Sequence, residues 1–504
     1  MKKTLQTITA GLTALAVLAI LQTVPTHAAS FAVATGNDEN TDNSSCSLTE
    51  AIENINDQAA TNTDCPAGDG VNDTINIPAG TITLTADLPQ ITESVKVAGA
   101  DMADTIIDGD SAHRPFVVNS PFATFEISSV KIQNYFKLAV ESINGNVALQ
   151  DLDVFGGGVN PGGSNGGGII LGNNSGSSNE ISINNVTIHD FNLSSGYIHT
   201  MVIWSTQGST TNASVKNVTL ANIINNTGGI NGFATGVGLM DPTQASGEMN
   251  LSASNLTVDG LSAPSAVVGA INVVSFSATG DATANINIVN TTVTDTVSGT
   301  NQFSATGSLL VGSAGIADGT NASANLTSTN LISSENIFDG AKGTCGESDL
   351  TSLFSGQGSA SNSITSGGGN LSDDTTCYPY FTQPTDQNNL TNLGSTLGSL
   401  QNNGGIVPTR ALLNGSPAID SGITIPGLTQ DARGSVRPQG LAYDSGAYES
   451  PFTTAQSSTP VKQAAQTLAD TGESRRIFIL CAVLVVLTSL SVIVAIKRQK
   501  KPQK

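Results

Sequence analysis

Four side chains in the middle of the chain carry groups that could do acid–base chemistry, namely Asp151, Asp153, His189 and Asp190. Two carboxyl groups about 5–10 Å apart can hydrolyse a glycosidic bond, and the adjacent His189 and Asp190 could move a proton. If neighbouring repeats stack, the three aspartates would lie near one another. This candidate site for sugar cleavage competes with a simpler interpretation, in which the four residues occupy outward strand positions and turns.

Basic residues that would serve an acidic substrate are scarce in this region. A lyase acting on acidic sugars would need Ca²⁺ and a basic group that abstracts a proton. Between Lys137 and Lys342 the one Lys or Arg is Lys216. This scarcity argues against an acidic-sugar site, so we expect a binding protein rather than an enzyme and assign no catalytic residue.

The charge balance sets further limits on partners. The chain contains 19 Lys and Arg against 40 Asp and Glu, which gives a net charge of −21. Such a surface repels phosphates, so we expect no nucleic acid partner. It would accept cations, but the acidic run Asp101, Asp104, Asp108 and Asp110 lacks the spacing of an EF-hand calcium loop. We predict no metal site and no cofactor, with Ca²⁺ the one ion that composition leaves open.

Short segments that alternate apolar and polar residues recur through the chain, and strict alternation is typical of a β-strand. Five of them loosely follow the form apolar-x-apolar-x-Asn-x-Thr-apolar: 181–188, 213–220, 251–258, 286–293 and 324–331. Their key asparagines follow at steps of 32, 38, 35 and 40 residues: Asn185, Asn217, Asn255, Asn290 and Asn330. A period in the thirties indicates a solenoid.

Second apolar runs lie between these segments, at 166–171, 198–204, 265–274 and 308–316, and Gly-rich stretches such as 156–168 provide turns. No single coil can bury its apolar face, but stacked coils bury each other's. We therefore predict an all-β fold, a right-handed parallel β-helix whose asparagines stack into a hydrogen-bonded ladder. The alternatives are a tandem of β-sandwich modules and chance repetition in an Asn- and Thr-rich chain.

Both ends of the chain resemble targeting segments. Residues 1–29 combine a basic start, an apolar run and small residues, the pattern of a signal peptide, and we expect cleavage after Ala28 or Ala29. A retained signal anchor is the alternative. Residues 477–496 are uncharged and long enough for a transmembrane helix, and the basic tail 497–504 should stay in the cytoplasm. The part between them is therefore predicted to lie outside the cell.

Five cysteines are present, and one of them, Cys481, lies in the C-terminal apolar run. The other four lie in the exported part, where disulfides persist. Cys46 and Cys65 are 19 residues apart, and Cys345 and Cys377 are 32 apart. Pairing within each couple is the simplest of the three connectivities. A zinc site is not expected, because no Cys-x-x-Cys and no nearby His accompany them.

Two stretches resemble parts of a known group of bacterial surface proteins. Cys46-Ser-Leu-Thr-Glu-Ala-Ile52 resembles the Cys-Ser-Leu-Arg-Glu-Ala motif near their N-terminus, with Thr49 in place of Arg. The block from Leu400 to Glu449, which contains Gly415-Ser-Pro-Ala-Ile-Asp-Ser-Gly422, closely resembles the choice-of-anchor domain that ends bacterial parallel β-helix surface proteins. The resemblance covers the start and end of the outer part, and it implies a β-helix followed by an envelope anchor.

A sorting-like signal precedes the C-terminal apolar run. Its five residues resemble the Leu-Pro-x-Thr-Gly signal of sortase substrates: Leu468, Ala469, Asp470, Thr471 and Gly472. Ala469 stands where these signals have proline, which kinks the peptide. Either a tolerant sortase cuts between Thr471 and Gly472, or the apolar helix stays in the membrane.

These features divide the chain into seven parts: signal peptide 1–29, N-terminal cap and first coils 30–120, parallel β-helix 121–390, choice-of-anchor-like domain 391–450, Ser/Thr/Pro-rich stalk with the sorting-like signal 451–474, transmembrane helix 477–496 and cytoplasmic tail 497–504. We expect a surface protein held to the envelope or membrane by its C-terminal tether, with a sortase as processing partner. Its function would be adhesion or the binding of an extended ligand, such as a carbohydrate or a partner-cell surface. A polysaccharide lyase or glycosidase is the alternative.

Overall fold

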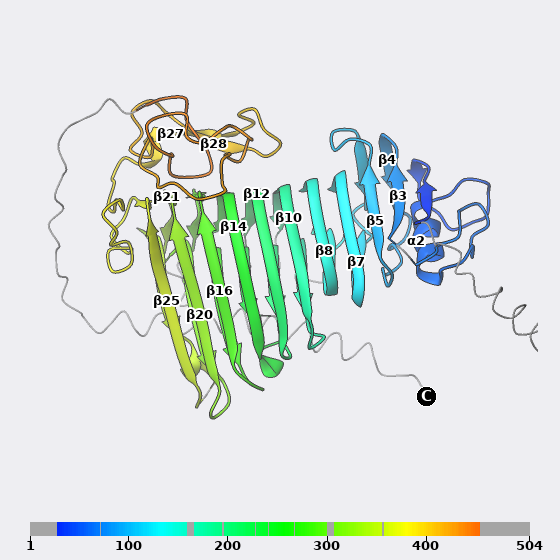
Figure 1. Cartoon of the computed structure of the whole chain (residues 1–504), viewed down its shortest axis with the longest axis horizontal. Helices are drawn as coiled ribbons and strands as arrows, with labels where there is room; N and C mark the ends of the chain where they lie inside the picture. The colour runs from blue at the N-terminus through cyan, green and yellow to red at the C-terminus, as the bar shows by residue number, and fades with distance from the viewer. Residues whose placement is uncertain are drawn as a thin grey trace, which may run out of the picture.

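The described part of the computed structural model is mostly β-structure. It comprises residues 28–453 except 71, 159–165, 194–195, 227, 240, 267, 300–306 and 355–356. Strands β1–β26 belong to one hydrogen-bonded sheet with almost entirely parallel pairings, an arrangement compatible with a β-helix solenoid. They lie side by side along the long axis of the molecule (Figure 1). The signal peptide apart from its last two residues, most of the stalk, the sorting-like signal and the apolar run lie outside the described residues.

The N-terminal part contains short strands and one α-helix: β1 Ser30–Ala32, β2 Gly36–Asn37, α2 Leu48–Asp57, β3 Asp73–Ile77, β4 Gly80–Thr83, β5 Val95–Gly99 and β6 Thr105–Asp108. In the middle, long and short strands alternate from β8 onward: β7 Phe116–Gln133, β8 Val140–Phe155, β9 Gly166–Asn173, β10 Ser178–Leu193, β11 Ile198–Ser205, β12 Ser209–Asn225, β13 Ile230–Val237, β14 Gly247–Ala263 and β15 Val268–Ser277. A 3₁₀-helix, η1 Pro242–Gln244, precedes β14.

The later strands are shorter: β16 Ala282–Val289, β17 Thr292–Thr294, β18 Val297–Ser298, β19 Leu309–Gly315, β20 Asn321–Thr329, β21 Ile332–Ser334, β22 Ile337–Phe338, β23 Ala341–Lys342, β24 Cys345–Asp349, β25 Ser359–Gly368 and β26 Leu371–Ser372. Two further 3₁₀-helices are η2 Thr351–Phe354 and η3 Gly394–Thr396. Strands β27 Leu397–Gln401 and β28 Thr409–Leu412 form a separate antiparallel pair.

Strand register follows the repeat that the sequence predicts. In the middle of the chain each long strand pairs in parallel with the next long strand, so that Ile181 of β10 lies opposite Ala213 of β12, which in turn lies opposite Leu251 of β14. Ile286 of β16 continues this column. The predicted second apolar runs form β9, β11, β15 and β19, which confirms them as strands. One detail differs, because Ile286 pairs with Leu326 and not with the first residue of the fifth segment.

The core is a column of aliphatic side chains along the stacking direction. In β10 buried and exposed residues alternate up to its first bend, and the inward residues Ile181, Ile183, Val186 and Ile188 are each at most 2% exposed. Strands β11, β13 and β15 are buried at every position. Their outer side chains join a second apolar cluster that includes Trp204. Parallel strands buried on both faces have continuous apolar runs of this kind.

Bends in the coils fall at residues with left-handed backbone. The five recurrent asparagines have φ values of 51–56°: Asn185, Asn217, Asn255, Asn290 and Asn330. Asn tolerates this conformation better than most residues. Their side chains form the predicted ladder, with Nδ2 to Oδ1 distances of 2.9 Å from Asn217 to Asn185 and from Asn255 to Asn217, and of 2.8 Å from Asn330 to Asn290. The ladder is interrupted between Asn255 and Asn290, where the facing Oδ1 and Nδ2 atoms have no partner.

Helix α2 lies at the N-terminal end of the stacked strands (Figure 1). Ser47 and Glu50 form a capping box at its start, and Ile52 and Ile55 on its buried face are each 1% exposed. The predicted disulfides are both present, Cys46–Cys65 and Cys345–Cys377. Helix α2 therefore covers the apolar end that a stack of coils would otherwise expose to water. No helix within the described ranges is long and apolar enough to span a membrane.

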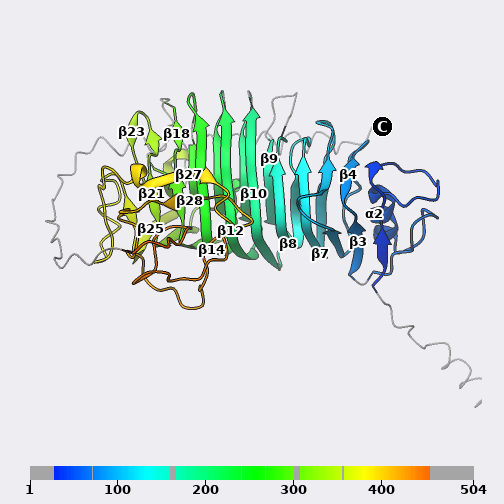
Figure 2. The same cartoon turned by 90° about the horizontal axis from the view of Figure 1, so that it is seen from above.

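The segment 391–450 packs on the side of the stacked strands near their bends (Figures 1 and 2). Thr219 Oγ1 donates to Pro408 O at 2.7 Å, and Asn330 Nδ2 donates to Ile423 O at 2.8 Å. Arg410 reaches three acidic residues from three successive coils. Its Nε lies 2.8 Å from Asp259 Oδ1, and it also pairs with Asp295 and, at 3.9 Å, with Glu335.

Candidate functional site

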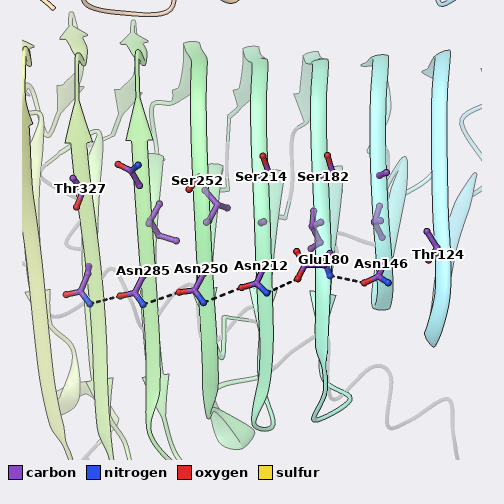
Figure 3. A pocket seen from close by; sticks show the side chains of 18 residues that line it. Thr124, Asn146, Glu180, Ser182, Asn212, Ser214, Asn250, Ser252, Asn285 and Thr327 are labelled. Atoms are coloured by element: carbon purple, nitrogen blue, oxygen red, sulfur yellow. Dashed lines mark hydrogen bonds between the residues drawn. The ribbon is translucent and has the colours of Figure 1, made fainter. Parts of the chain in front are cut away.

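An open pocket of about 850 Å³ runs across the outer face of β8, β10, β12, β14, β16 and β20. We call it the amide pocket. One wall is a row of side chains at matching register positions: Asn146, Glu180, Asn212, Asn250, Asn285 and Asn325. The other wall is a second row, two positions further along each strand: Ala148, Ser182, Ser214, Ser252, Asn287 and Thr327. Outward residues two apart point to the same face of a strand, so two rows flank a strip of backbone (Figure 3).

Hydrogen bonds fix the first row along the stacking direction (Figure 3). Asn212 Nδ2 donates to Glu180 Oε1 at 2.8 Å, Asn250 Nδ2 to Asn212 Oδ1 at 3.3 Å, and Asn285 Nδ2 to Asn250 Oδ1 at 3.2 Å. Asn325 Nδ2 continues the row to Asn285 Oδ1 at 3.1 Å. Each primary amide has two N–H donors and two lone pairs on its oxygen. These bonds therefore orient the amides and leave further donors and acceptors for a ligand.

The lining of the amide pocket is almost uncharged. Glu180 is its one ionisable residue, and its described lining contains no Lys, Arg or aromatic side chain. Amides and hydroxyls at regular spacing suit a partner rich in hydroxyl groups. An anionic polymer would find no cation to pair with in this lining.

The sequence did not single out this row of asparagines. The signal was present, because Asn212, Asn250, Asn285 and Asn325 follow one another at the same steps of 38, 35 and 40 residues as the bend asparagines. Four of the five bend asparagines stand two residues before a Thr, a pattern that marks them in the sequence. Only the strand register shows that the second column faces outward.

Three of the four candidate catalytic residues meet on neighbouring coils. His189 Nε2 lies 2.8 Å from Asp153 Oδ1, and His189 Nδ1 lies 2.7 Å from Asp190 Oδ2. Phe155 stacks on the imidazole with ring centroids 5.2 Å apart. Asp151 takes a different place, because its Oδ1 accepts a hydrogen bond from Asn185 and extends the bend ladder.

The electrostatics of His189 favour the imidazolium. Burial alone would lower the pKa of His189, but the hydrogen bonds and negative charges of Asp153 and Asp190 outweigh it and raise the pKa above its usual 6.5. Both ring nitrogens are thus held by carboxylates, which leaves neither as a base for a substrate. His199, the other histidine in this region, lies on β11, and burial lowers its pKa to about 4. Its Nδ1 is 3.1 Å from Asn231 Nδ2.

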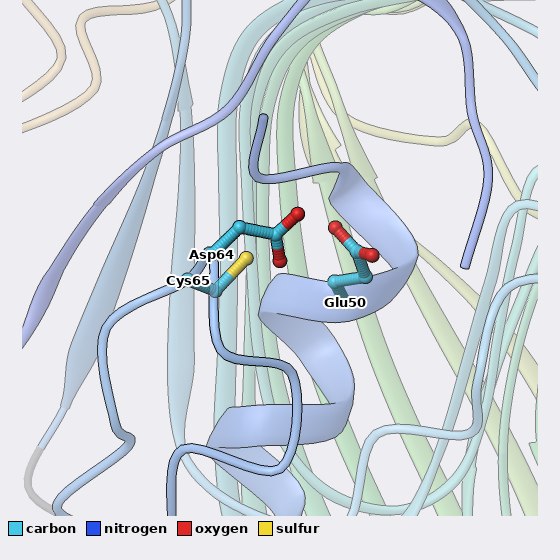
Figure 4. Close-up of side chains that lie close together, drawn as sticks. All are labelled: Glu50, Asp64 and Cys65. Carbon is cyan, nitrogen blue, oxygen red and sulfur yellow. The ribbon is translucent and has the colours of Figure 1, made fainter. Parts of the chain in front are cut away.

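Acidic residues near the N-terminal cap do not form a three-ligand metal site. Glu50, Asp64 and Cys65 lie close together, as Figure 4 shows, but the Cys65 sulfur is bonded to Cys46. Burial raises the pKa of the Glu50 carboxyl, and the negative charge of Asp64 adds to the rise. Glu50 Oε2 accepts the backbone N–H of Ser47 in the capping box.

The acidic run at 101–110 forms turns. Asp101 Oδ1 accepts the backbone N–H of Ala103 at 2.7 Å, and Asp108 Oδ1 accepts that of Asp110 at 2.9 Å. Such side-chain-to-backbone bonds stabilise Asx turns. The carboxylates therefore have a structural role in connecting the early strands.

Comparison of the chain with protein families, with curated proteins and with solved structures found no match.

Proposed function

We propose that the chain is an exported bacterial surface protein whose right-handed parallel β-helix binds an extended, neutral, hydroxyl-rich polymer along the amide pocket. The observation that carries this proposal is the pair of parallel rows of amides and hydroxyls that crosses six strands. A ligand lying along these rows would meet the same chemistry at each coil, at intervals of about 4.8 Å set by strand spacing. Extended solenoid faces are suited to binding polymers.

The anchoring part of the proposal rests on sequence patterns. Residues 391–450 would serve as a choice-of-anchor-like domain, and the tether would be the apolar run 477–496. The Leu468–Gly472 signal would be either cut by a sortase or left intact. Mass spectrometry of wall digests distinguishes these fates: wall-linked peptides ending at Thr471 indicate cleavage, whereas intact tail in the membrane fraction excludes it.

Ligand binding is tested with the purified full chain in detergent and a panel of insoluble neutral and acidic polysaccharides. Ser214→Leu with Ser252→Leu fills the amide pocket from two exposed positions and leaves the core untouched. Thr210→Leu is the matched control, because Thr210 faces outward on the same strand β12 and lies outside the lining. We expect binding to neutral polymers, reduced at least tenfold by the pocket variant alone. Equal binding by the two variants, or binding to acidic polymers only, would contradict the proposal.

A sugar-cleaving enzyme is the second candidate, because Asp153 and Asp190 bring two carboxyl groups together at His189, and paired carboxyl groups can hydrolyse a glycosidic bond. The same polysaccharides are assayed for released reducing ends and unsaturated products. An activity that is abolished by His189→Ala and Asp190→Ala would replace the binding proposal. Polymer binding that survives both changes would favour the proposal.

A further inference from the structure

The first residues of the described chain are held by a buried carboxylate. The backbone nitrogen of Ala29 lies 2.7 Å from Asp73 Oδ1, and Ala29 O accepts the backbone N–H of Thr74 at 2.8 Å. The Ala29 methyl packs against the main core cluster. From Ser30 onward the chain continues as β1, which pairs in parallel with β3. Ala29 is therefore fixed through its nitrogen, its carbonyl and its side chain.

Asp73 is 0% exposed, and this burial raises the pKa of its carboxyl. Its Oδ2 accepts the backbone N–H of Asp69 at 3.1 Å, and the Asp69 carboxyl is a neighbouring negative charge. None of the ion pairs formed within the described ranges involves Asp73. Buried carboxylates are ordinarily paired with a cation, because an uncompensated buried charge is strongly unfavourable. Beside Asp73, the Ala29 nitrogen occupies the position that such a cation would take.

We propose that the chain is processed by hydrolysis of the Ala28–Ala29 peptide bond, and that the α-ammonium group so created at Ala29 forms an ion pair with Asp73. Water adds to the Ala28 carbonyl carbon and the carbon–nitrogen bond breaks. The leader leaves with a new carboxylate at Ala28, and the Ala29 nitrogen is protonated. The catalyst is a signal peptidase of the cell envelope, so this inference rests on the export part of the proposed function.

The geometry selects this bond over the next one. Cleavage after Ala29 would remove the nitrogen that contacts Asp73, the carbonyl that accepts from Thr74 and the packed methyl group. Signal peptidases favour small residues at the last and third-last positions of the leader. Cleavage after Ala28 puts Ala28 and Thr26 there, whereas cleavage after Ala29 puts the larger His27 at the third-last position. Ala28 is exposed, which leaves the bond at the surface.

The first test is N-terminal sequencing of the full chain isolated from the cell envelope. We expect Ala29 as the first residue. An envelope protein that begins at Ser30 would overturn this inference and leave the proposed function intact. A chain that begins at Met1 and stays in the cytosol would overturn the export on which both rest, and an envelope chain that begins at Met1 would overturn the cleavage alone.

The second test measures the ion pair by the rate at which the α-amine of the processed chain is acylated at pH 8, followed by mass spectrometry of its N-terminal peptide. A partnered ammonium holds its proton more tightly than a free one, whose pKa is about 7.7–8.0. We therefore expect acylation at least about fivefold slower in the folded chain than in urea. Asp73→Asn should abolish this protection, whereas Asp104→Asn, at an exposed carboxyl remote from Ala29, should keep it. Equal rates for the folded and unfolded wild-type chain would overturn the ion pair without depending on either variant.

Discussion

Replacing Arg410 by methionine would test how the segment 391–450 is held on the stacked strands. Methionine keeps the apolar stem and removes the charge. The Arg410 side chain is 12% exposed and that of Asp259 is 8% exposed, so the substitution leaves a nearly buried carboxylate without its cation. Breaking a buried pair in this way typically costs about 3–5 kcal/mol. Asp295 and Glu335 are 40% and 44% exposed, so water can replace the lost contact at each for less than about 1 kcal/mol.

We therefore expect Arg410→Met to destabilise the docking of residues 391–450 by about 3 kcal/mol, the lower end of that range. The lower end applies because burial raises the pKa of Asp259, so that protonation can remove part of the unpaired charge. Hydrogen–deuterium exchange at residues 391–450 should quicken by about 10²-fold, with little change in β8–β12. Adding Asp259→Asn should restore much of the protection, since it removes the unpaired charge.

Arg114→Met is the matched control, because Arg114 pairs with Glu141 near the other end of the molecule. It should leave exchange in 391–450 unchanged. If Arg410→Met leaves the protection of this segment as it is in the wild type, the three-coil ion-pair cluster does not hold it, and the reasoning is refuted.

Three further outcomes are expected. NMR titration should give His189 a pKa above 6.5, and Asp153→Asn should lower that pKa. The stability that this contact contributes is fully present below pH 6.5 and is lost as the pH rises through the raised pKa of the folded state. A His189 pKa at its usual value would contradict the contact. Leu220→Ala, at a core position with 0% exposure, should lower the free energy of unfolding by about 2–5 kcal/mol in denaturant titrations; a loss below about 1 kcal/mol would argue against the stacked core. Reducing Cys345–Cys377, which spans 32 residues, should cost about 3–4 kcal/mol in the same assay, and an unchanged midpoint would show that this bridge does not constrain the unfolded chain.

The parts of the fold that the sequence predicts are those in which successive coils carry the same residue types at matching positions. The bend asparagines were predictable because the left-handed backbone admits few residue types, so Asn185 and Asn217 recur at a recognisable interval. The pairing of Cys46 with Cys65 was predictable as the simplest local connectivity. Both inferences need only the order of residues along the chain.

The contacts that the sequence did not predict join residues that no local sequence pattern identifies as partners. Arg410 meets Asp259 and Asp295 across more than a hundred residues, and its neighbours along the chain contain nothing that points to them. The contact between His189 and Asp153 depends on the register of β8 against β10, in which Thr187 rather than His189 lies opposite Asp153. The coil length also varies between 32 and 40 residues, so no fixed period could give that register.

Two columns of asparagine with the same steps therefore have different physical roles, and backbone conformation separates them. Asn217 has a φ of 53° and donates within the bend ladder, so its identity follows from the fold. Asn212 lies five residues earlier, at an outward position of the same strand β12, where the extended backbone would admit most residues. The fold alone does not require amides at Asn212, Asn250 and Asn285. A row of amides repeated on successive strands, at outward positions whose backbone admits most residues, favours a ligand that contacts the row.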